Sequence, residues 1–396
     1  MQTQLPESLL ATDRGQRAQT ILRSCVHCGF CNATCPTYQL FGDELDGPRG
    51  RIYQIKSFLE TGEATLRINT HLDRCLTCRS CETTCPSGVA YGELLEIARE
   101  SLPDDRVWWR RLLIWGLKAV VPRRQLLRPV AALGNLMKPL LPGSLAQKVP
   151  PMRVADPLRL GTHPRKVIVL QGCVQSVSTP EVNTHLARLL DARGIEVLDV
   201  RAETCCGSLA LHLGDEPAAI GAMVGNVRAL AGYLDSVEAV ISTASGCGVT
   251  VQDYGRHLAG TAEAAEAESV AKKTLDVATF LAQSGLRFNR SREEKRIAWH
   301  TPCTLQHGQR SRGVVEGLLR AAGYELTPVA DPHLCCGSAG TYSILQPDTA
   351  QALRDRKLDS LEGGNPELIA TANIGCQLHL ASAAGVPVVH WLQLLK

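Results

Sequence analysis

The sequence predicts a multidomain α+β protein in which a helical, cysteine-rich N-terminal part precedes two copies of one α/β unit. Three observations support this prediction: the length of 396 residues, the uneven distribution of 16 cysteines, and an internal duplication in the second half of the chain. A chain of this length is too long for one small module and has room for two or three domains, each able to bury a core.

The cysteines divide the chain into zones. Eight of them lie between residues 25 and 85, none lies between 101 and 160, and the other eight lie beyond residue 161. Together with the duplication described below, this distribution predicts four parts: residues 1–100, 101–160, 161–290 and 291–396.

Composition narrows the class of protein. The formal net charge is only +3 and charged residues make up 20% of the chain, so the sequence lacks the basic excess that drives nucleic-acid binding, and we expect no nucleic-acid partner. The N-terminus lacks the pattern of a secretory signal, and no apolar run approaches the roughly 18–20 residues that cross a bilayer, so we expect a cytoplasmic protein. Cysteines in that reducing compartment indicate metal or redox chemistry rather than disulfides.

The second half of the chain is an internal duplication. KVIVLQGC, TCCGS and EAVISTASGC in the first copy match KRIAWHTPC, LCCGS and ELIATANIGC in the second, and the matched cysteines are separated by 130, 130 and 129 residues. Such a constant separation indicates two copies of one structural unit. The first copy alone has an Ala/Glu-rich insertion at 261–273, which we expect to form a solvent-facing helix.

Each copy has the pattern of βαβ units. A short apolar run at 167–170 or 297–299 is followed by a helical pattern such as 182–190, and then by a second apolar run at 195–200 or 324–329. Strands that alternate with helices favour a parallel sheet covered by helices. The cysteines follow directly after predicted strands, and ligands of open α/β sheets lie beyond the carboxyl ends of the strands. Both copies therefore present cysteines where a cofactor is expected.

Two runs of four cysteines in the N-terminal part share the pattern C-x2-C-x2-C-x3-C-P and lie fifty residues apart. This spacing is typical of bacterial two-cluster ferredoxins, in which three closely spaced thiolates bind one cluster and the fourth ligates the other. Two zinc sites are the alternative, but structural zinc usually uses separated C-x2-4-C pairs. We therefore assign Cys25, Cys28, Cys31 and Cys85 to one [4Fe–4S] cluster, and Cys35, Cys75, Cys78 and Cys81 to the other.

The segment between the two runs differs from the short hairpins of a minimal ferredoxin. DGPRGRIYQIKSFLE has a helical pattern after the Gly47-Pro48 turn, so we expect an α-helical ferredoxin-type domain. Arg49 and Arg51 at the start of this helix either lie near the clusters and offset their negative charge or face solvent. We favour the solvent-facing interpretation for both.

Each copy in the second half contains two adjacent cysteines followed by glycine, with one cysteine upstream and one downstream. Adjacent residues rarely both ligate one zinc ion, whereas four thiolates on neighbouring loops can hold an iron–sulfur cluster; reduced thiols without metal are a third interpretation. The candidate ligands are Cys173, Cys205, Cys206 and Cys247 in the first copy and Cys303, Cys335, Cys336 and Cys376 in the second.

This arrangement resembles the CCG domain of the heterodisulfide reductase family, in which two such repeats carry non-cubane iron–sulfur clusters. The resemblance implies an additional cluster in at least one repeat. Each full repeat of that family ends in C-x2-C, whereas Thr250 and His379 stand at the last position here, with His379 a candidate helper ligand. His300 and His307 flank Cys303, and we expect them to pack or form hydrogen bonds rather than bind metal.

The order of the whole chain, a helical two-cluster ferredoxin followed by two CCG repeats, resembles the iron–sulfur subunits of flavin-linked 2-hydroxy-acid and glycerol-phosphate dehydrogenases. The detailed match is closest to the glycolate oxidase (glycolate dehydrogenase) iron–sulfur subunit family, through CVHCGFCNATCPTYQLFGDELDGPRGRIYQIK, HLDRCLTCRSCETTCPSGVAYGELL, HTPCTLQHGQ, DPHLCCGSAGTYSILQPD and TANIGCQLHLAS. The resemblance runs from about residue 20 to residue 396.

The resemblance implies an electron-transfer subunit of a complex that oxidises glycolate to glyoxylate. FAD would lie on partner glycolate oxidase subunits, and electrons would leave towards a membrane quinone or similar carrier. No G-x-G-x-x-G motif follows a predicted strand, so we expect no dinucleotide site in this chain and no dehydrogenase activity from it alone. Lactate and anaerobic glycerol-3-phosphate dehydrogenases are the alternative complexes, and a cluster-containing redox sensor or scaffold is the alternative of a different class.

A basic, tryptophan-containing segment separates the two halves. Residues 101–150 contain nine Lys/Arg and two acidic residues, and RVWWRRLLIWGLKAVVPRRQLLR at 106–128 mixes three tryptophans with arginines and leucines. Tryptophan at an apolar–polar boundary and arginine near anionic headgroups suit a helix lying in the membrane plane. A helix packed on a partner protein has the same preferences. We therefore expect either peripheral association with the inner face of the cytoplasmic membrane or a protein interface.

Overall fold

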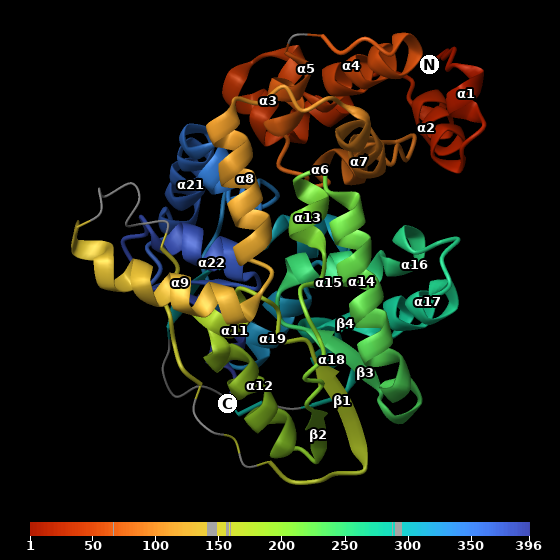
Figure 1. Cartoon of the computed structure of the whole chain (residues 1–396). Coiled ribbons are helices and arrows are strands. Elements are labelled where there is room, and N and C mark those ends of the chain that lie inside the picture. Colours follow the sequence, from red (N-terminus) through yellow and green to blue (C-terminus); the bar gives the residue numbers. More distant parts are fainter. Residues whose placement is uncertain (66, 141–148, 156–157, 159, 287, 290–294) are drawn as a thin grey trace.

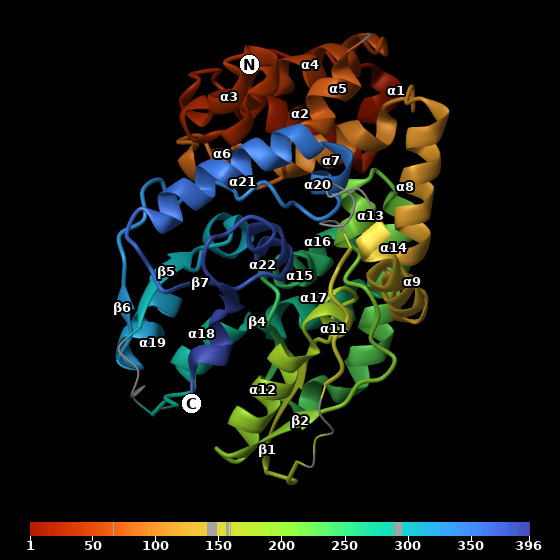
Figure 2. The ribbon, with the colours of Figure 1, turned by 90° about the vertical axis from the view of Figure 1, so that its left-hand side faces the viewer.

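The computed structural model describes residues 1–396 except 66, 141–148, 156–157, 159, 287 and 290–294. Figures 1 and 2 show a helical N-terminal region seated on one end of a larger α/β region. Two helices, α8 (Trp108–Val120) and α9 (Arg124–Met137), run along one side of the α/β region and are followed by the short turn η3 (Lys138–Leu140). The predicted α+β architecture, helical first and then built on parallel sheets, is confirmed.

The N-terminal region consists of short helices around its own apolar core, in which Leu22, Ile55 and Leu94 are fully buried. Its central helix begins with Pro48 in the first turn and ends at Thr61. The next residue, Gly62, has a φ of 74°, which suits glycine just after a helix C-terminus. The elements are α1 (Glu7–Leu10), α2 (Asp13–Ser24), η1 (Phe30–Thr34), α3 (Pro36–Phe41), η2 (Glu44–Asp46), α4 (Pro48–Thr61), α5 (Ile68–Asp73), α6 (Ser80–Thr84) and α7 (Tyr91–Ser101).

Two four-stranded parallel sheets form the centre of the α/β region. Their strand orders, β2-β1-β3-β4 and β6-β5-β7-β8, describe the same topology, as the duplication predicts. In the first sheet Val167 lies between Val197 and Ala239 on the neighbouring strands. The strands are β1 (Arg165–Val169), β2 (Ile195–Leu198), β3 (Ala239–Ser242) and β4 (Thr274–Asp276), then β5 (Arg296–His300), β6 (Glu325–Leu326), β7 (Leu368–Thr371) and β8 (Val388–His390).

Alternate residues of each sheet face different helix layers. Val167 and Ile241 of the first sheet and Ile297 of the second face one shared core, whereas Val240 and Ala298 face separate outer layers. The shared layer contains α12 (Pro180–Asp191), α18 (Val277–Gln283), α19 (Val314–Ala321) and η6 (Trp391–Leu394). The outer layers contain α14 (Glu216–Leu230), α15 (Ser245–Gln252), α16 (Tyr254–His257) and α17 (Ala264–Lys273) on the first sheet, and α21 (Pro347–Glu362) and α22 (Ile374–Ala381) on the second.

Shorter helices and turns complete the α/β region, and the candidate cysteines lie outside them. These helices and turns are α11 (Gln175–Ser178), α13 (Ser208–His212), η4 (Ala231–Ser236), the π-helical turn η5 (Thr304–Gly308) and α20 (Tyr342–Leu345).

The insertion of the first repeat forms the helix α17, as predicted, but only one of its faces is exposed. Ala267 and Val270 are fully buried in the same core as Met223 of α14. The expectation of a solvent-facing helix is therefore corrected: alanine and valine recur on one face of the helix, and that face closes the outer layer of the first sheet.

Candidate metal centres

The two four-cysteine loops of the N-terminal region have matching backbone conformations. In the first loop His27 and Gly29 have φ values of 60° and 87°, and in the second loop Thr77 and Arg79, at the corresponding positions, have φ values of 52° and 58°. Left-handed conformations are uncommon for residues other than glycine and cluster at functional sites. Each loop therefore folds back on itself in the same way. The first three cysteines of each loop line one cavity, and the fourth lines the other cavity.

The first group of cysteines assigned from the sequence, Cys25, Cys28, Cys31 and Cys85, lines one cavity. Burial raises the pKa of Cys31 to about 11, and the repulsion that Cys25, Cys85 and Cys28 would exert as thiolates adds to this shift. Cys28 is exposed, so this cavity lies at the surface of the N-terminal region. Four sulfur donors around one cavity fit an iron–sulfur cluster.

The second group, Cys35, Cys75, Cys78 and Cys81, lines a neighbouring cavity, and Cys81 lines both. Burial raises the pKa of Cys78 and of Cys81 well above the ordinary value, and other cysteines of the group contribute. A buried set of thiolates needs a positive centre to offset its charge, so the donor set again fits an iron–sulfur cluster.

Arg51 lies beside the second cysteine group, and the prediction that it faces solvent is wrong. Its side chain is 1% exposed, and one guanidinium nitrogen is 4.0 Å from the Cys35 sulfur. Burial lowers the pKa of Arg51, but attraction to Cys75, Tyr91 and Cys35 outweighs this effect and raises it overall. The helix α4 turns this residue inward, where its charge offsets that of thiolates. Arg49, two residues earlier, is partly exposed.

Asp46 anchors the buried guanidinium. Its carboxylate is fully buried, lies 3.6 Å from the Arg51 nitrogen, and accepts hydrogen bonds from His71 Nδ1 at 3.0 Å and from Arg74 at 2.7 Å. Asp46 and His71 belong to no metal-binding motif that could be recognised in the sequence. Asp46 and His71 form an ion-pair network with Arg51 and Arg74, and this network fixes the helix that bears Arg51.

The second cysteine group lies directly against the second repeat. Cys78 and Cys303 pack in one small cluster with Cys335, and after burial it is Cys303 that contributes most to raising the pKa of Cys78. Thr83 and His307 Nδ1, 2.8 Å apart, form a hydrogen bond across the same boundary. His307 thus forms hydrogen bonds, as predicted, and one of them joins the two regions.

In the first repeat the four candidate cysteines follow β1, β2 and β3 at the carboxyl ends of the strands. The Cys173 thiol donates to the Cys205 sulfur at 3.7 Å, and this bond lowers the pKa of Cys205 while it raises the pKa of Cys173. Cys206 and Cys247 line an adjoining cavity, and Asn226 donates to the Cys205 carbonyl at 2.9 Å. Asn226 thereby holds the loop that bears the paired cysteines.

Glu203 also lines the cavity of the first repeat. Burial raises its pKa to about 7, although Arg124 and the backbone N–H groups of Gln171 and Gly172 oppose that shift. Glu203 could not be predicted from the sequence, because nothing in the local pattern of a loop glutamate indicates burial.

In the second repeat the four candidate cysteines occupy the equivalent positions after β5, β6 and β7. The Cys303 and Cys335 sulfurs are 3.9 Å apart, and Asn373 donates to the Cys376 sulfur at 3.7 Å. Lys357 of α21 is buried and donates to the carbonyls of Asp331 and Pro332, just before the paired cysteines. It takes the loop-holding role that Asn226 has in the first repeat, but with a positive charge.

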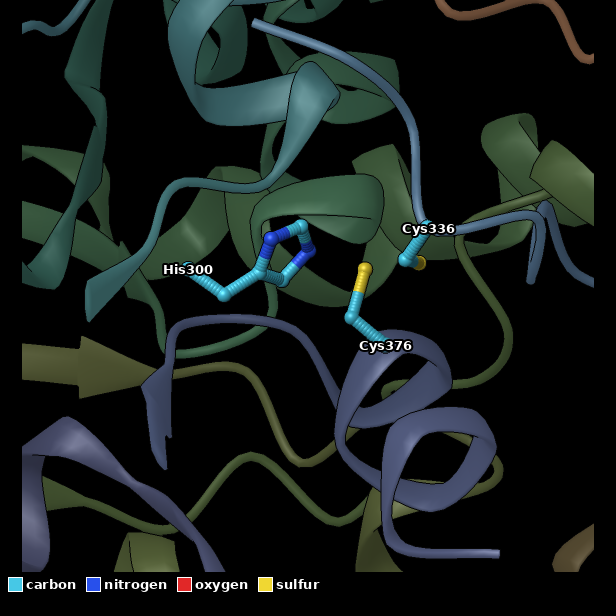
Figure 3. A group of neighbouring side chains, drawn as sticks. All are labelled: His300, Cys336 and Cys376. Atoms are coloured by element: carbon cyan, nitrogen blue, oxygen red, sulfur yellow. The ribbon is translucent and has the colours of Figure 1, made fainter. Parts of the chain in front are cut away.

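His300, the last residue of β5, faces two of these cysteines. Figure 3 shows the imidazole ring beside Cys336 and Cys376, and one nitrogen of the ring and the two sulfurs all lie within 4.8 Å of one another. Neither ring nitrogen has a hydrogen-bond partner among the residues that the structure describes. We expected His300 to pack or to form hydrogen bonds. It is buried, as packing requires, but its position beside two cysteines was not predicted.

The residues that replace the last cysteine of the CCG pattern each form a hydrogen bond to the backbone. Thr250 donates to the carbonyl of Gly246 within α15, at 3.1 Å. His379 Nε2 lies 3.1 Å from the carbonyl oxygen of Ala350. His379 therefore makes a backbone contact that joins α22 to α21.

The basic segment forms α8 and α9, whose inner faces are tied to the protein. Arg106, just before α8, bridges to Asp73 at 3.0 Å, and Lys118 of α8 bridges to Asp215 at 2.6 Å. Leu127 and Ala131 of α9 pack with Val177 of α11. The outer faces keep large apolar side chains exposed, with Trp108 75% and Trp115 65% accessible. We call these residues the α8/α9 apolar face: Trp108, Leu112 and Trp115 on α8, and Leu126, Val130, Leu133 and Met137 on α9. Within the described part of the chain, no helix is long and apolar enough to cross a bilayer.

Comparison with protein families agrees with this architecture. Residues 21–89 match the model of the 4Fe-4S dicluster domain, and residues 167–252 and 297–381 each match the model of the cysteine-rich CCG domain. The chain is therefore an iron–sulfur protein that joins a two-cluster ferredoxin-type domain to a duplicated CCG domain.

Relatives along the whole chain narrow this class. The "Glycolate oxidase iron-sulfur subunit" of Escherichia coli (strain K12) is 47% identical over 401 residues, covering 100% of this chain and 98% of the relative. The "Probable glycolate oxidase iron-sulfur subunit" of Bacillus subtilis (strain 168) is 28% identical, covering 91% and 88%. This chain belongs to the family of glycolate oxidase iron–sulfur subunits, as the sequence motifs predicted.

More distant similarities cover the architecture in part. "Lactate utilization protein A" of Geobacillus kaustophilus (strain HTA426) is 28% identical over 54% of this chain and 90% of its own length. A crystal structure of a hypothetical protein from Helicobacter pylori superposes with a TM-score of 0.57 at 7% identity, covering 98% of this chain and 75% of that one. The second similarity shows a shared fold only.

Proposed function

We propose that this chain is the electron-transfer subunit of a glycolate oxidase complex. FAD-containing partner subunits oxidise glycolate to glyoxylate, the chain accepts the electrons, and a membrane quinone or similar carrier takes them from it. Glycolate loses two electrons and two protons, and a quinone gains two of each on reduction to quinol, so the reaction balances. The observation that carries the proposal is the succession of cysteine groups from exposed Cys28 to Cys78 and on to Cys303 in the second repeat.

The ligand assignment made from the sequence is part of this proposal. Bound [4Fe–4S] clusters would supply one-electron transfer. The chain's own residues hold them and tune their surroundings, with Arg51 supplying a buried positive charge beside Cys35. The proposed ligands are Cys25, Cys28, Cys31 and Cys85 for one cluster, and Cys35, Cys75, Cys78 and Cys81 for the other. The eight cysteines of the two CCG repeats would hold a further iron–sulfur cluster or clusters.

We also propose the division into residues 1–100, 101–160, 161–290 and 291–396. The N-terminal part has its own core, which supports the first boundary. The two CCG parts share a core, so we regard them as structural repeats and not as units that fold alone.

The decisive experiment compares three samples: the chain alone, the flavin subunits alone, and the assembled complex. Glycolate-dependent quinone reduction should require the complex. Glycolate should also reduce the iron–sulfur clusters of this chain, as followed by electron paramagnetic resonance (EPR), only when the flavin subunits are present. If the flavin subunits alone reduced quinone at the full rate, a scaffold role would replace the relay. Clusters that change oxidation state without quinone turnover would instead indicate a redox sensor.

The similarity to lactate utilization proteins favours a second candidate substrate. D-lactate differs from glycolate by one methyl group, which a binding pocket separates by roughly 1–3 kcal/mol. Testing glycolate, D-lactate, L-lactate and glycerol 3-phosphate with the same purified complex would rank the donors. A higher kcat/KM for lactate or for glycerol 3-phosphate would assign the chain to one of those alternative complexes.

We propose that the α8/α9 apolar face lies on the cytoplasmic surface of the membrane. Residues 106–155 contain ten Lys/Arg and no acidic residue. Arg106 and Lys118 pair with acidic residues elsewhere in the chain. Arg123, Arg128 and Lys138, however, are exposed on and beside α9, which matches an anionic lipid surface. Exposed tryptophans beside basic residues suit the headgroup layer, and each basic residue near such a surface contributes on the order of 1 kcal/mol. A flavin subunit is the alternative occupant of this face.

Vesicle flotation tests the membrane proposal. The complex should float with vesicles that contain phosphatidylglycerol and much less with purely zwitterionic vesicles. The double substitution Trp108→Ser and Trp115→Ser should abolish flotation, whereas Tyr233→Ser, at an exposed aromatic residue elsewhere, should not change it. Unchanged flotation together with loss of the flavin subunits on purification would identify a protein interface.

A further inference from the structure

The register of β5 directs His300 towards the cysteines of the second repeat. Along this strand Ile297 and Trp299 face the shared core, whereas Ala298 faces the outer layer that contains Cys336 and Cys376. Side chains alternate across a strand, so His300 lies on the same side as Ala298. The residue is only 1% exposed, so the ring is out of contact with solvent.

The imidazole is unsatisfied in this position. Both ring nitrogens are buried, and among the described residues neither has a hydrogen-bond partner. A buried polar group without a partner is costly, so such a group in a native structure calls for an unseen partner. A nitrogen of His300 and the sulfurs of Cys336 and Cys376 lie within 4.8 Å of one another, and one metal centre between them would satisfy all three (Figure 3).

The first repeat lacks this feature. Leu170 stands three residues before Cys173, as His300 stands three residues before Cys303. Leu170 packs in an apolar core with Cys205 and has no polar atom in its side chain. The fold therefore accepts an apolar residue at this position, and the histidine of the second repeat is not required for packing.

We propose that His300 is an iron ligand of the second CCG repeat, binding through a ring nitrogen together with Cys336 and Cys376. This inference rests on the proposed function, in which the repeat holds an iron–sulfur centre. Imidazole is neutral where thiolate is negative, so replacing a thiolate by imidazole raises the reduction potential of a cluster. The centre nearest the second ferredoxin-type cysteine group would thus accept electrons more readily than one held by thiolates alone.

The test uses the full chain, purified without oxygen, and EPR signals. Cys376→Ser first identifies which signal belongs to the second repeat, and Cys247→Ser identifies any signal of the first. Pulsed EPR of the second-repeat signal should reveal directly bound ¹⁴N, and growth with ¹⁵N-histidine should change that coupling to the ¹⁵N pattern without any substitution. A signal of the first repeat should carry no such coupling.

Two substitutions complete the test. His300→Cys should retain iron, abolish the nitrogen coupling and lower the midpoint potential, whereas His300→Leu, which copies the first repeat, should abolish the coupling and lower the iron content. His379→Gln is the matched control and should leave the coupling unchanged, because His379 contacts a backbone carbonyl. Circular dichroism checks that each variant folds; if neither does, the ¹⁵N comparison on the unsubstituted chain decides.

The outcomes separate this inference from the function on which it rests. An iron signal that Cys376→Ser removes but that carries no histidine nitrogen would overturn the role of His300 alone. Coupling that persists in His300→Cys would overturn it too. If Cys376→Ser changed no iron signal, or if the repeat held zinc, the proposed iron–sulfur centre would fail together with its ligand.

Discussion

The N-terminal half and the α/β half each contain two copies of a cysteine-bearing unit, and the copies are related differently in the two halves. In the N-terminal half the two loops keep the same spacing and the same left-handed turns, at His27 and Thr77 and again at Gly29 and Arg79. In the α/β half the topology is kept, but residues around the cysteines differ between the copies, as Leu170 and His300 do.

The arrangement of the cysteines explains this difference. Each cavity of the N-terminal half is lined by cysteines from both loops, as Cys31 with Cys85 and Cys35 with Cys78 illustrate. A change in one loop therefore affects both cavities. Each cysteine group of the α/β half comes from one repeat, so the environment of one group can change while the other is kept. Shared sites preserve symmetry, and separate sites permit specialisation.

Replacing single cysteines of the two loops gives the largest predicted effect, the loss of a cluster. Cys35→Ser should remove the same EPR signal as Cys78→Ser, although Cys35 belongs to the first loop, because a neutral hydroxyl is a poor iron ligand. Cys85→Ser should remove the same signal as Cys28→Ser. If Cys35→Ser and Cys28→Ser removed one common signal instead, each loop would hold its own cluster and the contrast between the halves would disappear.

The link between the two loops can be tested at Arg51. Its guanidinium lies near Cys35 of the first loop and Cys75 of the second, and it pairs with the buried Asp46. Arg51→Met removes this buried partner of Asp46, so it should lower the free energy of unfolding by about 3 kcal/mol or more. Arg49→Met, at a partly exposed ion pair with Glu44, should cost no more than about 1 kcal/mol. Thermal unfolding of both variants, loaded with iron, measures the difference. Equal losses would show that burial of Arg51 matters less than we infer.

The glycines of the two CCG sequences test how closely the repeats correspond. Gly207 and Gly337 have φ values of 90° and 84°, which cost other residues roughly 1–2 kcal/mol. A Cβ on Gly337 would lie 2.5 Å from the Ala350 carbonyl oxygen, whereas on Gly207 it would lie 3.1 Å from that of Ala219. Gly337→Ala should therefore lower the unfolding temperature more than Gly207→Ala. The reverse order would contradict the tighter packing of the second repeat.

The last prediction concerns two equivalent helix caps whose protonation affects stability in opposite directions of pH. Asp276 caps α18 and His390 caps η6, and both are buried. Burial raises the pKa of Asp276 to about 7, so the stability that its protonated form contributes is lost as the pH rises from about 4 to about 7. Burial lowers the pKa of His390 to about 4, so the stability that its neutral form contributes is lost as the pH falls from about 6.5 to about 4.

Asparagine and glutamine separate the two titrations. Asp276→Asn should flatten the decline in unfolding temperature towards pH 7, because the amide keeps an acceptor for the Ala278 N–H without ionising. His390→Gln should flatten the decline towards pH 4. Profiles of both variants that parallel the unsubstituted chain would mean that neither cap titrates in this range.

The cysteine loops and the duplication could be predicted because their signals are local. A run such as Cys25 to Cys35 fixes its own spacing, and the constant separation of the matched cysteines reveals a repeat without knowledge of the fold. Strand and helix order followed from the alternation of apolar runs and amphipathic segments, and the strands after which the cysteines lie were placed to within a few residues.

Arg51 and His300 could not be predicted because their roles depend on tertiary packing. The inward direction of Arg51 is set by the buried network of Asp46, whose members are distant in sequence. The predicted strand at 297–299 ended before His300, and what its side chain meets on its face of the sheet depends on where the loop bearing Cys336 returns. A position-by-position comparison of the copies, with leucine at 170 and histidine at 300, contained the only local signal.

The central helix layer has a consequence for how the protein is made. Val182 and Leu186 of the first repeat pack in the same core as Trp391 and Leu392, which lie about 200 residues later in the sequence, at the end of the second repeat. During synthesis the first repeat emerges with this apolar face uncovered, and it stays uncovered until the second repeat has been translated. Nascent chains with exposed apolar surface aggregate readily, so we expect the α/β half to depend on chaperones during translation and to acquire its iron only after release from the ribosome.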